Sequence, residues 1–139
     1  MKVLVAADAR WVRDQVRTAL VAPGQEVIEV TRGQDVRGAV AEHEPDLVVL
    51  DLQIANMGGI AVAMDLHLEE SGGRLPHVPI LLLLDREADR FLAKRATTEA
   101  VLVKPVDPGT LRRTVRRLVG GDDRAAALRR AGAESTDLQ

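Results

Sequence analysis

Two short, unbroken apolar runs constrain the fold of this chain more than any other feature. Leu47–Leu50 and Ile80–Leu84 contain only leucine, valine and isoleucine, and each is followed by an aspartate. Runs of this length are too short for a typical helix, and a strand that is apolar at every position is buried on both faces. The chain must therefore cover a sheet on two sides. The first of these runs delivers Asp51 to the edge of that sheet.

Similar runs alternate with segments whose apolar residues recur at helical spacing. The predicted strands are 3–7, 27–30, 46–50, 80–84 and 100–103. The predicted helices are 10–21, 36–40, 60–70, 85–95 and 110–119, with Phe91 and Leu92 facing inward in the fourth. Alternation of this kind is typical of right-handed βαβ units. It predicts a single doubly wound α/β domain, with a five-stranded parallel sheet in the flavodoxin-like order 2-1-3-4-5 and five helices.

A change of composition marks the end of this domain. Gly120-Gly121 is followed by two aspartates, a short segment rich in alanine and arginine, and a polar end. We expect residues 1–119 to form the domain. Residues 120–139 are expected to be a C-terminal tail, either a short helix or disordered.

Composition excludes several classes of function. The chain has 19 Lys and Arg residues against 21 Asp and Glu, a net charge of −2, so no global charge draws it to nucleic acid or to a membrane. It has no cysteine, which excludes disulfides and thiolate metal sites. Its apolar runs are far below the roughly 20 residues of a membrane span, and Met1-Lys2 leads directly into a strand without a signal peptide. We expect a cytoplasmic protein that binds neither DNA nor membranes directly.

Charged residues follow three of the predicted strands: Asp8, Asp51 and Lys104. In the order 2-1-3-4-5, strands one and three are neighbours about 4.8 Å apart, so Asp8 and Asp51 can share one cation. Mg²⁺ takes one or two carboxylates, and the long side chain of Lys104 can reach Asp51 from two strands away. A carboxylate flanked by a divalent cation and an ammonium group can accept a phosphoryl group, because both neighbours neutralise charge on the transferring oxygens.

Each acid also has a simpler interpretation. Asp51 could cap a turn, and Asp8 could cap the helix that begins near Arg10. Asp85 suits the positive end of a helix dipole, which is the role that we favour for it.

Taken in order, these residues resemble the receiver domain of bacterial two-component response regulators. The matching features are Asp8, the segment Pro45–Asp51, Gly59 eight residues later, and Lys104-Pro105, within residues 1–119. The resemblance implies that Asp51 is the phosphoacceptor and that Lys104 pairs with the phosphoryl group. It also implies a magnesium ion bound by Asp8, Asp51 and the backbone carbonyl of Gln53, a cis bond between Lys104 and Pro105, and a histidine kinase or phosphotransfer protein as partner.

The chain departs from the family pattern at positions that matter for signalling. Ala7 replaces the first of two adjacent acids, and Leu84, or Asp85 in a shifted register, replaces the hydroxyl residue that ends the fourth strand. Val101 replaces the aromatic switch residue of the fifth strand. We therefore expect weaker binding of magnesium and no operation of the usual hydroxyl-to-aromatic relay.

The last predicted helix carries a basic stripe made of Arg112, Arg113, Arg116 and Arg117. Such a stripe is either a solvated face or a docking face. In receivers the fourth helix, fifth strand and fifth helix form the output and dimer surface, so the arginines could pair with Glu87 and Asp89 of a second copy.

The resulting prediction is a single-domain response regulator in phosphorelay signalling, a phosphoacceptor rather than an enzyme, which signals to an unidentified output protein by contact. The alternative is a pseudo-receiver that works without phosphorylation. The replacement of family residues by Ala7, Leu84 and Val101 supports this alternative. A third hypothesis is a flavin- or nucleotide-binding protein of the same fold. It would need a phosphate-binding loop rich in Gly, Ser or Thr after the first strand, and residues 6–10 supply none.

Overall fold

The computed structural model describes residues 1–54 and 56–120, so the predicted tail, 120–139, lies outside the described residues except for Gly120. Five strands form one parallel sheet in the order β2-β1-β3-β4-β5, as predicted. The strands are β1 (Lys2–Ala6), β2 (Glu26–Val30), β3 (Leu47–Asp51), β4 (Ile80–Leu84) and β5 (Ala100–Val103). The apolar runs β3 and β4 lie inside the sheet and are buried at every position, which is what their composition predicts.

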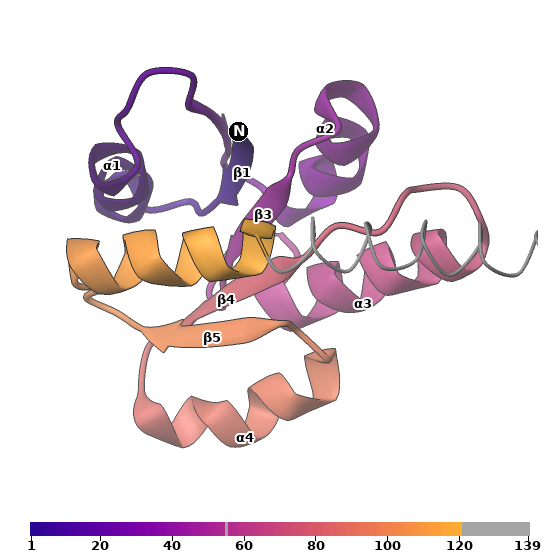
Figure 1. Cartoon of the computed structure of the whole chain (residues 1–139). Coiled ribbons are helices and arrows are strands. Elements are labelled where there is room, and N and C mark those ends of the chain that lie inside the picture. The colour runs from indigo at the N-terminus through magenta and orange to yellow at the C-terminus, as the bar shows by residue number, and fades with distance from the viewer. Residues whose placement is uncertain (55, 121–139) are drawn as a thin grey trace, which may run out of the picture.

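Helices cover both faces of this sheet (Figure 1). The helical elements are α1 (Arg10–Ala19), η1 (Gly33–Asp35), α2 (Val36–His43), α3 (Gly59–Ser71), η2 (Glu87–Asp89), α4 (Arg90–Ala93), η3 (Lys94–Ala96) and a last helix over 108–120. Alternate strand residues form two cores. One core lies against α2, α3 and α4, and the other lies against α1 and the 108–120 helix. No helix in the described residues is long and apolar enough to span a membrane.

The segment after β4 differs from the predicted continuous helix. It consists of the four-residue α4 between two 3-10 turns, and its buried residues are Asp89, Ala93 and Ala96. The prediction that Phe91 and Leu92 face inward was wrong, because Phe91 is 64% exposed and Leu92 is 37% exposed. Positions 89, 93 and 96 have the i, i+4, i+7 spacing of one helix face, and the two bulky side chains lie off that face.

Candidate functional site

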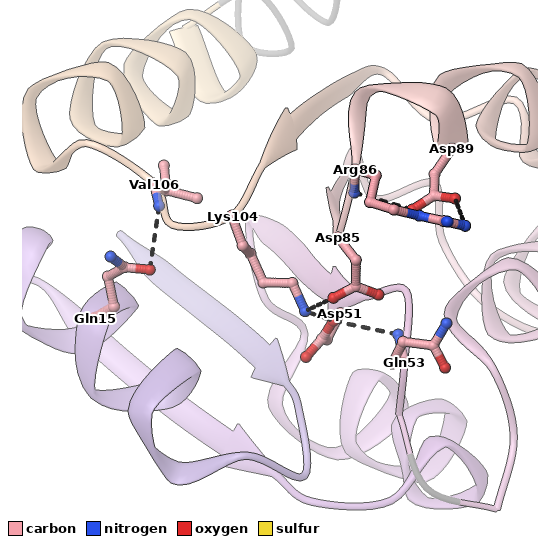
Figure 2. Close-up of polar contacts among 8 residues, drawn as sticks. All are labelled: Gln15, Asp51, Gln53, Asp85, Arg86, Asp89, Lys104 and Val106. Carbon is pink, nitrogen blue, oxygen red and sulfur yellow. Dashed lines mark hydrogen bonds and ion pairs between the residues drawn. The ribbon is translucent and has the colours of Figure 1, made fainter.

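The strand register brings the side chains at three strand ends to one face of the sheet. Asp51 pairs with Leu83, and Leu83 pairs with Leu102, so these three side chains share a face. Asp85 and Lys104 lie two residues beyond Leu83 and Leu102, and therefore return to the same face one step further on. Figure 2 shows the result: Lys104 extends from the end of β5 toward Asp51 and Asp85.

Asp51 is the most enclosed group of this site, at 2% exposed. Its Oδ1 atom accepts a hydrogen bond from the Lys104 ammonium at 2.5 Å and another from the backbone N–H of Gln53 at 3.2 Å. In the described part of the chain, both contacts go to Oδ1, so Oδ2 is left for an incoming group. Asp51 is thus anchored through one oxygen and available through the other.

Gly59, the first residue of α3, allows the helix to start directly over the loop that follows Asp51. A Cβ atom at Gly59 would lie 2.4 Å from the backbone oxygen of Asp51. The Gly59 N–H instead donates to the carbonyl of Leu52 at 3.0 Å. This close approach explains why a glycine follows the acid at this spacing.

Lys104 is shared between two carboxylates. Its Nζ atom lies 2.5 Å from Asp51 Oδ1 and 2.8 Å from Asp85 Oδ1, and its side chain is only 7% exposed. The Trp11 ring lies beside it, with 5.9 Å between Nζ and the ring centroid. Burial by itself would lower the pKa of Lys104, but the hydrogen bonds and charges of the two carboxylates outweigh burial and raise it. Lys104 therefore stays an ammonium cation throughout the physiological range.

Burial has the opposite effect on Asp51. Loss of water raises the pKa of the Asp51 carboxyl above its ordinary value, while the hydrogen bond and charge of Lys104 and the Gln53 N–H act to lower it. The charge of Asp85 adds to the increase. The ionised form of Asp51 is therefore maintained largely by Lys104.

Asp8 is exposed at the exit of β1, beside the exit of β3. It does not cap α1, because Ala9 is the N-cap residue there. Arg13 fixes the backbone at this point by donating from Nη1 to the carbonyls of Ala7 and Asp8, both at 2.8 Å. Among residues 1–54 and 56–120, no hydrogen bond or ion pair of the Asp8 carboxylate is found, which leaves it available to a cation.

Asp85 is the site residue whose role the sequence interpretation missed. We expected it to complement a helix dipole, but it precedes the N-cap residue Arg86 and its carboxylate binds Lys104. The signal was present in the sequence, because Asp85 follows a buried strand just as Asp51 does.

The comparison with known proteins decides the family. The sequence model of one protein family, the response regulator receiver domain, matches residues 3–116, which is most of the chain. The chain belongs to the receiver-domain family of response regulators. This confirms the predicted class. The structure itself contains the cis peptide bond between Lys104 and Pro105 that the resemblance implied.

Several relatives and solved structures illustrate the family. PilH of Pseudomonas aeruginosa is 25% identical over 86% of this chain and 98% of PilH. The response regulator PmrA of the same organism is 31% identical over 85% of this chain, but over only 52% of PmrA. The chain spans about half the length of most of the curated relatives that it matches, PmrA among them, and nearly all of PilH.

Two solved receiver structures share the fold. The BeF3-activated N-terminal receiver domain of RstA from Klebsiella pneumoniae has a TM-score of 0.74 and 22% identity, over 86% of this chain and 98% of that chain. The chemotaxis response regulator CheY4 of Vibrio cholerae has a TM-score of 0.72 and 24% identity, over 84% of this chain and 97% of that chain.

The three atypical positions of this receiver domain are all apolar in the structure. Ala7 is fully buried beside Asp8, and Leu84 is fully buried in the core against α2, α3 and α4. Val101 is half-buried on the edge strand β5 and lines a hollow with Ala93, Lys94 and other residues of the α4 region. No hydroxyl group or aromatic ring is therefore present at these three positions.

The predicted basic face is present, but one of the two acidic residues expected to pair with it, Asp89, is not exposed. Arg112, Arg113, Arg116 and Arg117 are all exposed on the 108–120 helix. Asp89, expected to pair with them in a second copy, is instead buried and accepts hydrogen bonds from Arg86, at 3.0 Å from the backbone N–H and 3.2 Å from Nη2. Asp89 is therefore committed within its own chain.

Proposed function

We propose that this receiver domain acts in a phosphorelay by accepting a phosphoryl group on Asp51 from a histidine kinase or phosphotransfer protein. The observation that carries the proposal is the geometry at Asp51: a nearly enclosed carboxylate, held through Oδ1 by the Lys104 ammonium at 2.5 Å, with Oδ2 available. In the transfer, the bond between phosphorus and the donor's histidine nitrogen breaks and a bond between phosphorus and Oδ2 forms. A proton on the other nitrogen of the donor ring keeps the leaving imidazole neutral.

Lys104 contributes a fixed positive charge to this step. Its ammonium is already in place, buried and charged, so little reorganisation is needed when charge develops on the phosphoryl oxygens. The backbone N–H of Gln53 keeps the carboxylate oriented through the same Oδ1 atom.

A magnesium ion fits the remaining groups. The described residues contain no cluster of three or more His, Asp or Glu that could hold a metal alone, but Mg²⁺ needs only one or two carboxylates and completes its shell with water and phosphate oxygens. The exposed Asp8 carboxylate has no competing partner among the described residues, and the Asp51 carboxylate and the Gln53 carbonyl would be the other protein ligands. When bound, the ion would neutralise charge on the phosphoryl oxygens.

Trp11 provides a direct test of the metal proposal, because it is the single tryptophan of the chain and its ring lies beside Lys104. Millimolar Mg²⁺ should change Trp11 fluorescence in the wild-type protein, and Asp8→Asn should weaken that response. An identical titration for both proteins would contradict the assignment of Asp8.

The phosphoacceptor itself is tested by intact-mass measurement after incubation with acetyl phosphate and Mg²⁺. The wild-type protein should gain one phosphate, and Asp51→Asn should gain none. An adduct that persists in Asp51→Asn would place the phosphate elsewhere. No adduct on the wild type, with acetyl phosphate or with kinases, would overturn the proposal and leave a pseudo-receiver.

We further propose that output passes through protein contact, and that the exposed arginines of the 108–120 helix belong to the contact surface. Arg112, Arg113, Arg116 and Arg117 are exposed on this helix, which leaves them accessible to a partner protein. Since beryllofluoride activates the related RstA receiver domain, sedimentation with and without beryllofluoride is the test for pairing of two copies. A monomer in both conditions would contradict a phosphorylation-dependent dimer.

A further inference from the structure

Two carboxylates compete for one cation in this site. Lys104 Nζ lies 2.5 Å from Asp51 and 2.8 Å from Asp85, and the ammonium is almost entirely removed from water. Asp85 is the more accessible of the two acids, at 38% exposed against 2% for Asp51. Figure 2 shows both carboxylates gathered at the tip of the Lys104 side chain.

The basic residue next to Asp85 in the chain does not relieve this competition. Arg86 is held by Asp89, which accepts from both its backbone N–H and its guanidinium. Asp85 therefore depends on Lys104 for its ion pair within the described residues.

Phosphorylation of Asp51 would change the balance of charge around Lys104. A phosphoryl group carries close to two negative charges at neutral pH and binds ammonium groups strongly. It would arrive beside Asp85, whose carboxylate is already bound to the same ammonium. The negative charges of the phosphoryl group and of the Asp85 carboxylate would repel each other, and salt weakens such repulsion where the groups are exposed.

We propose that Asp85 is a positioning residue that competes with the phosphoryl group for Lys104 and thereby restrains phosphorylation of Asp51. The inference rests on the proposed function of Asp51. In the unphosphorylated protein Asp85 holds Lys104, and on phosphorylation the carboxylate is displaced toward solvent.

This displacement would also reach the segment 87–96. Asp85 directly precedes Arg86, the N-cap residue of η2, and η2 leads into α4. The residue before Asp85, Leu84, is fixed in the core and has no polar group with which to respond to phosphate.

The test compares rates of phosphorylation by acetyl phosphate with Mg²⁺ at low and at high ionic strength, measured by intact mass. Asp85→Asn keeps the size of the side chain and removes its charge, and Asp85→Ser supplies a second neutral variant. Both should be phosphorylated roughly three- to tenfold faster than the wild type at low salt, and the difference should shrink at high salt. Asp35→Asn is the matched control, because Asp35 is similarly exposed and ion-paired, with Arg32 at 2.9 Å. It should behave like the wild type.

The outcomes separate the inference from the proposed function. If Asp51 is phosphorylated in every protein at the same rate and with the same salt dependence, Asp85 does not compete for Lys104. The inference is then overturned, while the proposed function of Asp51 stands. Slower phosphorylation of both neutral variants would likewise overturn it, because Asp85 would then assist Lys104. If neither the wild type nor the Asp85 variants gain phosphate, the proposed function fails and the inference fails with it.

Discussion

Replacement of Lys104 by methionine should destabilise the protein in a strongly pH-dependent way. Methionine keeps most of the aliphatic side chain and removes the ammonium group that lies 2.5 Å from Asp51 and 2.8 Å from Asp85. Asp51 would then be a buried carboxylate whose described contact is the Gln53 N–H at 3.2 Å. Asp85, which is 38% exposed, can regain water, so most of the cost falls on Asp51.

The direction of the pH dependence follows from the pKa of Asp51. Burial already raises this pKa although Lys104 acts to lower it, so loss of Lys104 raises it further. Between the ordinary aspartate pKa, about 3.9, and the raised value, the unfolded chain has released a proton that the folded protein still holds. The free energy of unfolding therefore falls as pH rises through this window, and the fall is larger without Lys104.

The size of the effect can be bounded. Removal of one partner from a buried ion pair costs about 3–5 kcal/mol, and protonation of Asp51 limits that cost, because each unit of pKa shift is worth about 1.4 kcal/mol. We expect Lys104→Met to lose about 3 kcal/mol near neutral pH and about 1 kcal/mol near pH 4. The raised pKa of Lys104 adds a contribution that is present below the ordinary lysine pKa and lost as pH rises through the higher folded value, and the variant lacks it.

Urea unfolding at several pH values measures these differences. Lys94→Met, at an exposed lysine, should change stability by less than about 0.5 kcal/mol. The double variant Asp51→Asn with Lys104→Met should recover most of the loss at neutral pH, because an uncharged amide has no ionisation to lose. An equal loss at pH 4 and pH 7, or no recovery in the double variant, would refute the reasoning.

Two further substitutions test how the site is supported, again by urea unfolding. Gly59→Ala would bring a Cβ within 2.4 Å of a backbone oxygen and should lower the free energy of unfolding by about 1–3 kcal/mol. The control Gly38→Ala meets no atom within 4 Å and should stabilise α2 by roughly 0.5–1 kcal/mol. Similar effects at the two glycines would contradict the close approach at Gly59. Asp89→Ala removes the buried acceptor of the Arg86 N–H and should cost about 1–2 kcal/mol, while Glu87→Ala, at an exposed residue, should cost less than about 0.5 kcal/mol. A loss for Glu87→Ala as large as that for Asp89→Ala would count against the cap.

The pairing of Asp51 with Lys104 could be anticipated from the sequence, because it depends only on the order of buried strands and on which residue follows each one. The same rule applies to Asp85 after β4, but the helical segment that follows Asp85 also suits an acid for local reasons, and the sequence pattern does not separate the two roles. The errors in the α4 region have a related cause. Phe91 and Leu92 were expected to face the core, whereas the spacing of Asp89, Ala93 and Ala96 decides which face is buried.

The sequence by itself determined the strands, the helices between them and the three charged strand ends, because runs of buried residues and their alternation with helices are local patterns. Only the tertiary structure decided that Lys104 forms ion pairs with two carboxylates and that Asp8 has no partner among the described residues. It also decided that Asp89 accepts a hydrogen bond from Arg86 within its own chain. The physical reason is register: the direction of each side chain reverses at every residue along a strand, so contacts across strands depend on alignment to a single residue. Asp85 lies next to Lys104 because β4 and β5 align Leu84 with Val103.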